Sequence, residues 1–255
     1  AADAILWSAR QALGEDKVDL ALTNGGGIRA SIPAGEISMK TMKTVFPFGN
    51  EVATVTVTGA ELLEALEAAT FCTPTAVGAF PQVSGVQFTI DTTVPYENGE
   101  MYPNSTYYAP AKPGSRIKNV TVNGQPLDLN AEYVVATNDF TAAGGDTYGA
   151  FLGKTPYNTG VALEQALVDY TATVLEGVIT EKDYGKPAGR ITVNTAPVPT
   201  ATPAPTASPT AAPTAAPTAV PTAAPTAAPT AQPAPSDPQI TLPATGDVQQ
   251  PVVVC

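Results

Sequence analysis

Residues 18–29 read VDLALTNGGGIR, a short and largely apolar run that ends in three consecutive glycines. The run over residues 18–23 is bounded by a turn signal, which predicts a short buried strand. Glycines lack a Cβ atom, so the backbone after the strand can approach a ligand closely and present its N–H groups to it. A tight turn without a ligand is the other interpretation of these glycines. The stretch therefore predicts a strand that delivers the chain to a glycine-rich loop.

The segments on either side predict both helices and strands. Residues 1–13 place Ile5, Leu6, Ala9 and Leu13 on one helical stripe, which predicts an amphipathic helix. Strands are expected at residues 52–58, 86–91, 116–122, 132–137 and 190–193, and helices from Ser38, over residues 60–69 and over residues 161–175. Because the order follows no strict βαβ repeat, the expected fold class is α+β, with mixed sheets and flanking helices. An α/β fold with antiparallel strands is the other possibility.

Composition excludes several functions. The 255 residues contain no histidine and carry a formal net charge of −11. Without histidine the chain cannot build a His-ligated zinc or two-metal centre, a Ser-His-Asp triad or a Cys-His dyad. An acidic chain repels nucleic-acid backbones and anionic membrane surfaces, so neither is an expected partner, and the sequence predicts no stable membrane span. Glu61, Glu64 and Glu67 lie at helical spacing and predict a solvated helix face, so no catalytic residue or metal ligand is expected.

The composition changes abruptly after Asn194. Proline recurs at every fourth residue from Pro205 to Pro233, and no charged residue occurs between Ile191 and Ser236. Such a tract buries too little apolar surface to offset its chain entropy, and its prolines favour the extended polyproline II conformation. We therefore expect a globular domain over residues 1–193 and a disordered Pro/Thr/Ala-rich spacer over residues 194–241. An interdomain linker and a glycosylated stalk are both open.

Residues 242–246 (LPATG) resemble the LPxTG sorting motif of Gram-positive surface proteins. The resemblance implies that a sortase cleaves between Thr245 and Gly246 and joins the threonine to peptidoglycan, so an extracellular, wall-anchored protein with a wall-spanning spacer is expected. An apolar span and a basic tail normally follow the motif, whereas DVQQPVVVC follows it here. Residues 242–255 are therefore expected to be a truncated sorting signal. A chance occurrence of LPATG in a disordered tail is the alternative.

Three segments, in this order, resemble the C-terminal domain of the 5′-nucleotidase family. They are residues 24–29 (NGGGIR), residues 46–50 (FPFGN) and residues 138–146 (NDFTAAGGD). One glycine-rich motif alone would be a weak signal, because such turns are common, but three in the same order are specific. The resemblance covers most of residues 1–193 and implies the mixed-sheet fold of that domain.

The same resemblance implies a nucleotide site. In the family, phenylalanines matching Phe48 and Phe140 clamp the base between their rings, and an aspartate matching Asp146 binds the ribose. Stacking of this kind tolerates different bases. The chemistry of the residues adds Asn24, which can donate to and accept from a base or a ribose, and Arg29, which can fork onto a phosphate. The predicted substrate-binding residues are Asn24, Gly26, Gly27, Arg29, Phe48, Phe140, Gly145 and Asp146.

Each of these residue types also has an ordinary structural role. A phenylalanine is most often a core residue, a glycine a turn residue, an arginine a surface ion-pair partner and an aspartate a helix cap. Phe46 is the expected core member of its motif. Asp139 departs from the family pattern, and the sequence assigns it no role beyond facing solvent.

The family's chemistry belongs to a separate N-terminal metallophosphoesterase domain, where a pair of divalent metals such as Zn or Mn activates a water. The chain begins within a helical pattern and carries none of those motifs, so we expect that domain to be missing and this part to be inactive alone, with no cofactor of its own. The expected function is substrate recognition in a surface-anchored 5′-nucleotidase that hydrolyses extracellular nucleotides. A non-catalytic nucleoside-binding or adhesive module is the alternative, and 2′,3′-cyclic nucleotides and UDP-sugars are alternative substrates within the family. Base preference and oligomeric state stay open.

Overall fold

The computed structural model describes residues 1–195. All but the first two residues of the predicted spacer lie outside the described residues. The predicted sorting signal, with Thr245 and Gly246, also lies outside them.

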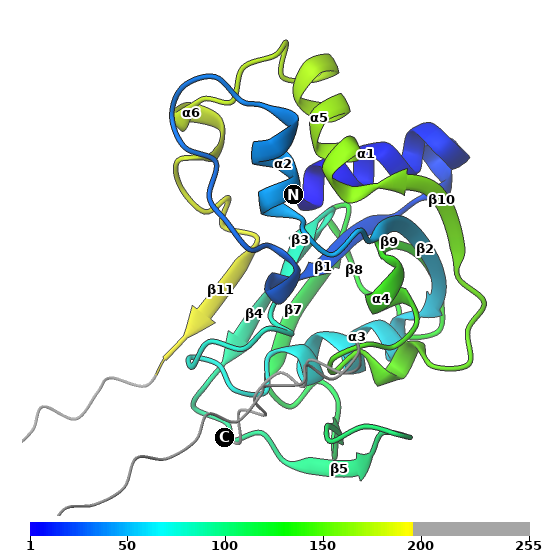
Figure 1. Ribbon diagram of the computed structural model, residues 1–255. Coiled ribbons are helices and arrows are strands. Elements are labelled where there is room, and N and C mark those ends of the chain that lie inside the picture. The colour runs from blue at the N-terminus through cyan, green and yellow to red at the C-terminus, as the bar shows by residue number, and fades with distance from the viewer. Residues whose placement is uncertain (196–255) are drawn as a thin grey trace, which may run out of the picture. The chain divides into compact units, whose positions relative to one another are not determined.

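A five-stranded sheet forms the middle layer of this domain (Figure 1). Its strands, from one edge to the other, are β10 (Tyr157–Ala162), β2 (Glu51–Thr58), β9 (Glu132–Asn138), β1 (Leu20–Asn24) and β3 (Pro81–Ser84). β1 and β9 are parallel, and the other neighbours are antiparallel. Every residue of β1 is buried, because other elements cover both faces of the sheet. This burial explains why the first three residues of β1 are all apolar, without the alternation typical of a half-exposed strand.

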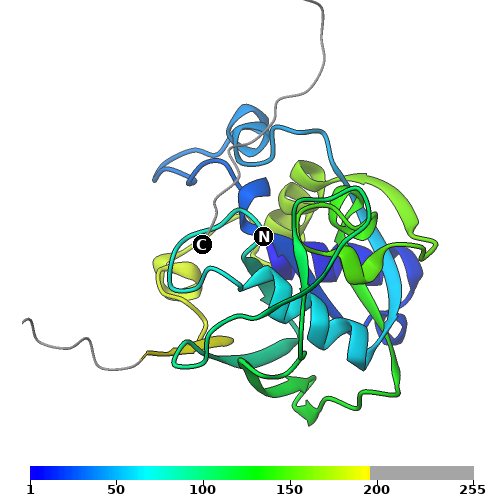
Figure 2. The same cartoon turned by 90° about the horizontal axis from the view of Figure 1, so that it is seen from below.

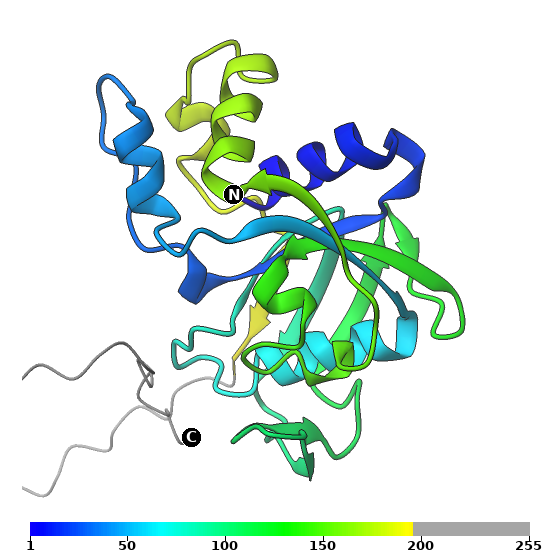
Figure 3. The ribbon, with the colours of Figure 1, turned by 45° about the vertical axis from the view of Figure 1, so that its right-hand side comes forward.

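Three helices cover one face of this sheet (Figure 3). They are α1 (Ala2–Leu13), α2 (Met39–Val45) and α5 (Leu163–Thr173). The predicted stripe on α1 is confirmed, since Ile5, Leu6 and Ala9 are buried against the sheet residues Ala21 and Ala136. Ser38 caps α2 by accepting a hydrogen bond from the N–H of a residue in its first turn, as the sequence predicts for a helix start.

The opposite face carries a second sheet and helix α3 (Gly59–Ala69), and Figure 2 views the molecule from that side. The second sheet has the order β11 (Ile191–Asn194), β4 (Val86–Asp91), β7 (Ile117–Val122) and β8 (Gln125–Pro126). Leu22 and Val55 of the first sheet pack with Leu66 of α3 and Ile90 of the second sheet in one core. A capping box between Thr58 and Glu61 begins α3.

Short elements complete the domain. They are the 3₁₀ turns η1 (Glu15–Lys17), η2 (Gly25–Gly27) and η3 (Gly149–Phe151), the hairpin of β5 (Asn98–Met101) with β6 (Tyr108–Pro110), and the helices α4 (Asp139–Ala142) and α6 (Glu181–Tyr184). No helix among residues 1–195 has the length and apolarity needed to cross a membrane. The α+β class with mixed sheets and flanking helices is confirmed.

Two expectations from the sequence are wrong in detail. The helix predicted over residues 161–175 begins at Leu163, because residues 161 and 162 belong to β10 and Ala162 pairs with Glu51. The acidic face of α3 is not fully solvated, because Glu67 is completely buried. Its carboxylate accepts hydrogen bonds from the backbone N–H of Gly114 and of Arg116, which lie in the loop before β7. Helical spacing does not reveal a loop that folds over the helix from 47 residues away.

Candidate functional site

The three predicted motifs lie at one edge of the five-stranded sheet. Since β1 and β9 are parallel, their carboxyl ends, Asn24 and Asn138, emerge on the same side. β2 is antiparallel to β9 and pairs Val52 with Asn138, so the amino end of β2 lies there too. The FPFGN segment directly precedes β2. Strand direction and register therefore bring the loops after β1, before β2 and after β9 together, although they are far apart in sequence.

Two buried side-chain amides and one carboxylate form a chain of hydrogen bonds at this edge of the sheet. Asn138 Nδ2 donates to Asn24 Oδ1 at 3.0 Å, and Asn24 Nδ2 donates to Asp146 Oδ2 at 2.8 Å. Because Asn138 Oδ1 also accepts from the Thr141 N–H, the orientation of both amides is fixed. Burial raises the pKa of the Asp146 carboxyl above its ordinary value, and the hydrogen bond from Asn24 opposes that rise. Asp146 is thus a partly buried acceptor held by one neutral side-chain donor.

Phe140 lies over Gly145 in the loop that follows β9. A Cβ atom at Gly145 would stand 2.5 Å from the Phe140 ring, so any side chain at this position would displace the ring. The Gly145 N–H also donates to the Phe140 carbonyl oxygen at 3.0 Å. The ring itself is 46% exposed. Phe140 therefore stands at the surface beside the residue that precedes Asp146.

Phe48 stands at the surface in the loop before β2. Its side chain is 57% exposed, whereas Phe46 is only 4% exposed and packs in the core under the helices, which confirms the expected division between the two rings. The Arg29 guanidinium carbon lies 5.9 Å from the centroid of the Phe48 ring, within the range of a cation–π contact. Arg29 Nη1 also donates to the Gly26 carbonyl oxygen at 3.2 Å. These contacts connect the glycine loop to the loop of Phe48.

The glycine loop itself packs against another part of the chain. The N–H groups of Gly25 and Gly26 donate to the carbonyl oxygens of Phe80 at 2.8 Å and Gly78 at 2.7 Å. The prediction that the loop presents its N–H groups to a ligand is therefore wrong for these two residues. A Cβ atom at Gly26 would stand 3.1 Å from Gly78 Cα, so close packing of two backbones explains the glycine. At Gly27 a Cβ atom would stand 3.1 Å from the Asn24 side-chain oxygen.

Asp139 connects the loops of the two exposed phenylalanines, which the sequence did not indicate. Its Oδ1 atom accepts hydrogen bonds from Asn50 Nδ2 at 2.6 Å and from the Phe140 N–H at 3.0 Å. The sequence assigns Asp139 no role, and in the structure the residue is half-buried and bonded across the two loops. The bond to Asn50 spans 89 residues of sequence, and no local pattern signals a contact of that kind.

These contacts join all the predicted substrate-binding residues at one place. Asn24 binds Asp146 and lies against Gly27, Arg29 binds Gly26 and lies against Phe48, and Phe140 lies against Gly145. The hydrogen bond between Asn50 and Asp139 connects the loop of Phe48 to the loop of Phe140. The site thus offers two exposed aromatic rings, a carboxylate, an amide and a guanidinium on neighbouring loops.

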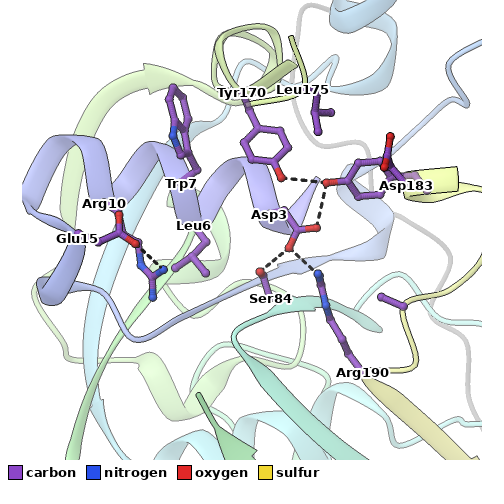
Figure 4. A pocket seen from close by; sticks show the side chains of 12 residues that line it. Asp3, Leu6, Trp7, Arg10, Glu15, Ser84, Tyr170, Leu175, Asp183 and Arg190 are labelled. Carbon is purple, nitrogen blue, oxygen red and sulfur yellow. Dashed lines mark hydrogen bonds and ion pairs between the residues drawn. The ribbon is translucent and has the colours of Figure 1, made fainter. Parts of the chain in front are cut away.

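A cavity of about 460 Å³ lies elsewhere in the domain, and none of the predicted site residues lines it (Figure 4). The Asp3 carboxylate beside it accepts hydrogen bonds from Ser84 at 2.5 Å, Arg190 at 2.8 Å and Tyr184 at 3.3 Å. Burial acts to raise the pKa of Asp3, but the bonds from Arg190 and Ser84 outweigh it and hold this pKa below its ordinary value. The charged and polar groups around Asp3 are paired with one another, which indicates a structural junction between α1, β3 and the segment before β11.

Comparisons with known proteins show the family of this domain. The family model described as the C-terminal domain of 5′-nucleotidase matches residues 1–153. The trifunctional nucleotide phosphoesterase protein YfkN of Bacillus subtilis is 37% identical over 155 residues, which is 59% of this chain and 9% of that protein. Protein UshA of Escherichia coli is 35% identical over 153 residues, which is 60% of this chain and 24% of UshA. This chain therefore spans about a quarter or less of the length of these relatives.

A solved structure is also similar. The crystal structure of the 5′-nucleotidase precursor from Thermus thermophilus superposes with a TM-score of 0.61 at 33% identity. The match covers 77% of this chain and 34% of that one.

Proposed function

This chain belongs to the 5′-nucleotidase C-terminal domain family, and we propose that it is the nucleotide-recognition domain of a surface-anchored 5′-nucleotidase. The observation that carries the proposal is the meeting of two exposed phenylalanines and a partly buried carboxylate at one sheet edge. Apolar side chains that gather on neighbouring loops, unlike those scattered singly over a surface, are typical of a binding site. A nucleoside supplies both a flat base and a pair of hydroxyls for these groups.

The base stacks between Phe48 and Phe140 in this proposal. Stacking on an aromatic side chain contributes about 1–3 kcal/mol per base and does not depend on the identity of the base. The ribose hydroxyls donate to Asp146, whose ionised form can accept more hydrogen bonds than the one that Asn24 supplies. Asn24 keeps this carboxylate in place and leaves its outer lone pairs for the sugar.

The phosphate lies near Arg29. This residue is exposed, and its Nη1 atom is held by the Gly26 carbonyl oxygen at 3.2 Å, so that contact orients the other N–H donors of the guanidinium. Gly26, Gly27 and Gly145 act here by allowing close packing of the loops around the ligand. A side chain at any of them would displace neighbouring groups of the site.

Hydrolysis belongs to a separate domain in this proposal, with a pair of divalent metals such as Zn or Mn. The residues of this chain do not fit such a pair, because the sequence has no histidine. Within residues 1–195, moreover, no three His, Cys, Asp or Glu residues are grouped so that they could share an ion. We therefore expect no phosphate release by this chain alone. Stacking and ribose binding do not distinguish 5′-mononucleotides from 2′,3′-cyclic nucleotides or UDP-sugars.

Wall anchoring rests on residues 242–246 (LPATG) after the charge-free spacer. A sortase would cleave between Thr245 and Gly246 and place the domain outside the cell, where extracellular nucleotides are its substrates. Incubation with a sortase and a glycine peptide, followed by mass spectrometry, tests this. Transfer of the peptide to Thr245 is expected, and an intact chain would contradict the assignment.

Calorimetric titration with AMP tests the binding proposal. We expect measurable binding by the whole chain, and a loss of about fivefold to a hundredfold in affinity for Phe48→Ala and for Phe140→Ala, since each variant removes one stacking surface. Both rings are exposed, so neither change should lower the melting temperature by more than a few degrees. Leu129→Ala, a surface residue 47% exposed, is the matched control and should leave the affinity unchanged. Unchanged affinity in both phenylalanine variants would contradict the aromatic clamp.

A further inference from the structure

Asp139 lies between the two loops that carry the exposed rings. Its Oδ1 atom accepts from Asn50 Nδ2 at 2.6 Å, from the Glu51 N–H at 3.3 Å and from the Phe140 N–H at 3.0 Å. Asn50 and Glu51 belong to the chain segment that leaves Phe48, and Phe140 directly follows Asp139. One carboxylate oxygen therefore binds both sides of the proposed clamp.

The backbone ladder ends just before this point. The pairing of β2 with β9 runs out to Val52 and Asn138, so the register of the two strands stops short of both rings. Gly49 has a φ of +70° and joins Phe48 to Asn50 through a turn that glycine adopts readily. Beyond the last strand pair, the hydrogen bond from Asn50 to Asp139 still joins the two segments. Asp139 directly precedes Phe140, and Asn50 follows Phe48 by two residues.

We propose that Asp139 is a positioning residue of the nucleotide site, which sets the spacing of Phe48 and Phe140 by binding Asn50 across the two loops. The inference rests on the proposed function, because it gives the spacing a purpose only if a base is held between the rings. Asp139 touches neither base nor sugar in this account. It acts through the backbone on which the rings are carried.

The chemistry of the contact predicts which substitution is tolerated. All three donors converge on one oxygen atom, so the site needs an acceptor rather than a full negative charge. Asparagine at this position retains one carbonyl oxygen of similar geometry, whereas alanine retains none. Asp139→Asn should therefore preserve the spacing, and Asp139→Ala should release the loops from each other.

The experiment measures AMP affinity and the NMR shifts of the adenine protons at saturation. A base between two rings has its protons shifted upfield by both ring currents, and a base beside one ring by one only. In the whole chain we expect Asp139→Ala to lose about five- to tenfold in affinity and to reduce the upfield shift towards that of Phe140→Ala. Asp139→Asn should stay within about twofold of the wild type in affinity and keep its upfield shift.

Asp91→Ala provides a matched control, since the Asp91 carboxylate also binds a nearby N–H and a hydroxyl, both of Thr93, on an exposed turn of the other sheet. It should change neither readout. A normal affinity and upfield shift in Asp139→Ala, together with a weakened Phe140→Ala, would overturn the role of Asp139 and leave the clamp intact. An equal loss in Asp139→Asn and Asp139→Ala would overturn it as well, because the charge rather than the acceptor would then matter. Unchanged affinity in Phe48→Ala and Phe140→Ala would overturn the proposed function itself.

Discussion

The loops around Asp146 and the junction around Asp3 both hold a partly buried aspartate between distant parts of the chain, but their carboxylates differ in how fully they are bound. Asp3 accepts from Ser84, Arg190 and Tyr184, and its pKa lies below the ordinary value. Asp146 accepts from one neutral amide, and its pKa lies above the ordinary value. A carboxylate that the protein has already surrounded with donors stabilises the fold, whereas one with vacant lone pairs is available to a ligand.

Replacement of Asp146 should produce the largest effect on binding. Asp146→Ala removes the acceptor for the ribose hydroxyls, and hydrogen bonds to a charged group contribute about 1.5–3 kcal/mol each, so we expect AMP affinity to fall by at least about tenfold. The free energy of unfolding should fall by about 1 kcal/mol, because the buried Asn24 amide loses its acceptor. Calorimetry and thermal unfolding measure the two effects.

Asp128→Ala is the control for that change, since within residues 1–195 its carboxylate binds the Asn130 N–H alone, on an exposed turn. It should alter neither affinity nor stability appreciably. Full AMP affinity in Asp146→Ala would contradict the view that Asp146, unlike Asp3, is available to a ligand.

Replacement of Arg190 should lower the stability of the domain and leave its AMP affinity unchanged. Arg190→Ala removes the charged partner of the Asp3 carboxylate and a donor to the Val83 carbonyl oxygen. The ion pair is partly buried, since the Arg190 side chain is 31% exposed and the Asp3 side chain 16% exposed. We expect the free energy of unfolding to fall by about 1–2 kcal/mol and AMP affinity to stay unchanged. Denaturant unfolding checks this, with Lys17→Ala as the control, because the Lys17–Asp16 pair is exposed and contributes little. A loss of AMP affinity in Arg190→Ala would show that the junction and the site are one unit.

The smallest expected effect is on pH dependence, because the pKa values of the two aspartates shift in opposite directions. Asp3, with a lowered pKa, contributes stability that is complete above its ordinary pKa of 3.8 and is lost as pH falls through its folded value below that. Asp146, with a raised pKa, is protonated already above pH 3.8, and its ionised form costs stability there. Adenosine binding, which involves no phosphate, should therefore weaken on acidification before the domain loses the contribution of Asp3.

Titrations with adenosine at several pH values measure this dependence. Asp146→Asn should bind more weakly and show no such weakening, since an amide does not titrate in this range. The same pH dependence in Asp146→Asn as in the wild type would assign the proton to another group.

The sequence predicted the layout of the fold for a physical reason, whereas the site residues follow from the resemblance of three motifs and stay predictions. Strand and helix periodicity depends on neighbouring residues, so the sequence predicts β2, β4, β9 and α1 correctly. The loop-forming residues around Phe48 likewise distinguish this exposed ring from the buried Phe46. The contacts that it missed depend on register between distant segments. Asp139 meets Asn50 only because β2 pairs with β9.

The same cause explains the misassigned glutamate and glycines. Glu67 is buried by the loop at residues 114–116, and the N–H groups of Gly25 and Gly26 are taken by the carbonyls of Phe80 and Gly78. A glycine that packs against a distant backbone and one that presents its N–H to a ligand have the same local sequence. Only the position of the opposing segment distinguishes them.

Nucleotide capture by this chain is the central claim, and a calorimetric comparison of AMP, adenosine and ribose 5-phosphate tests it most directly. AMP and adenosine should both bind, because each carries the base that stacks on Phe48 and Phe140 and the hydroxyls that donate to Asp146. Ribose 5-phosphate lacks the base and should bind at least about tenfold more weakly than AMP. Equal affinities for AMP and ribose 5-phosphate, or no heat with any of the three, would contradict the account.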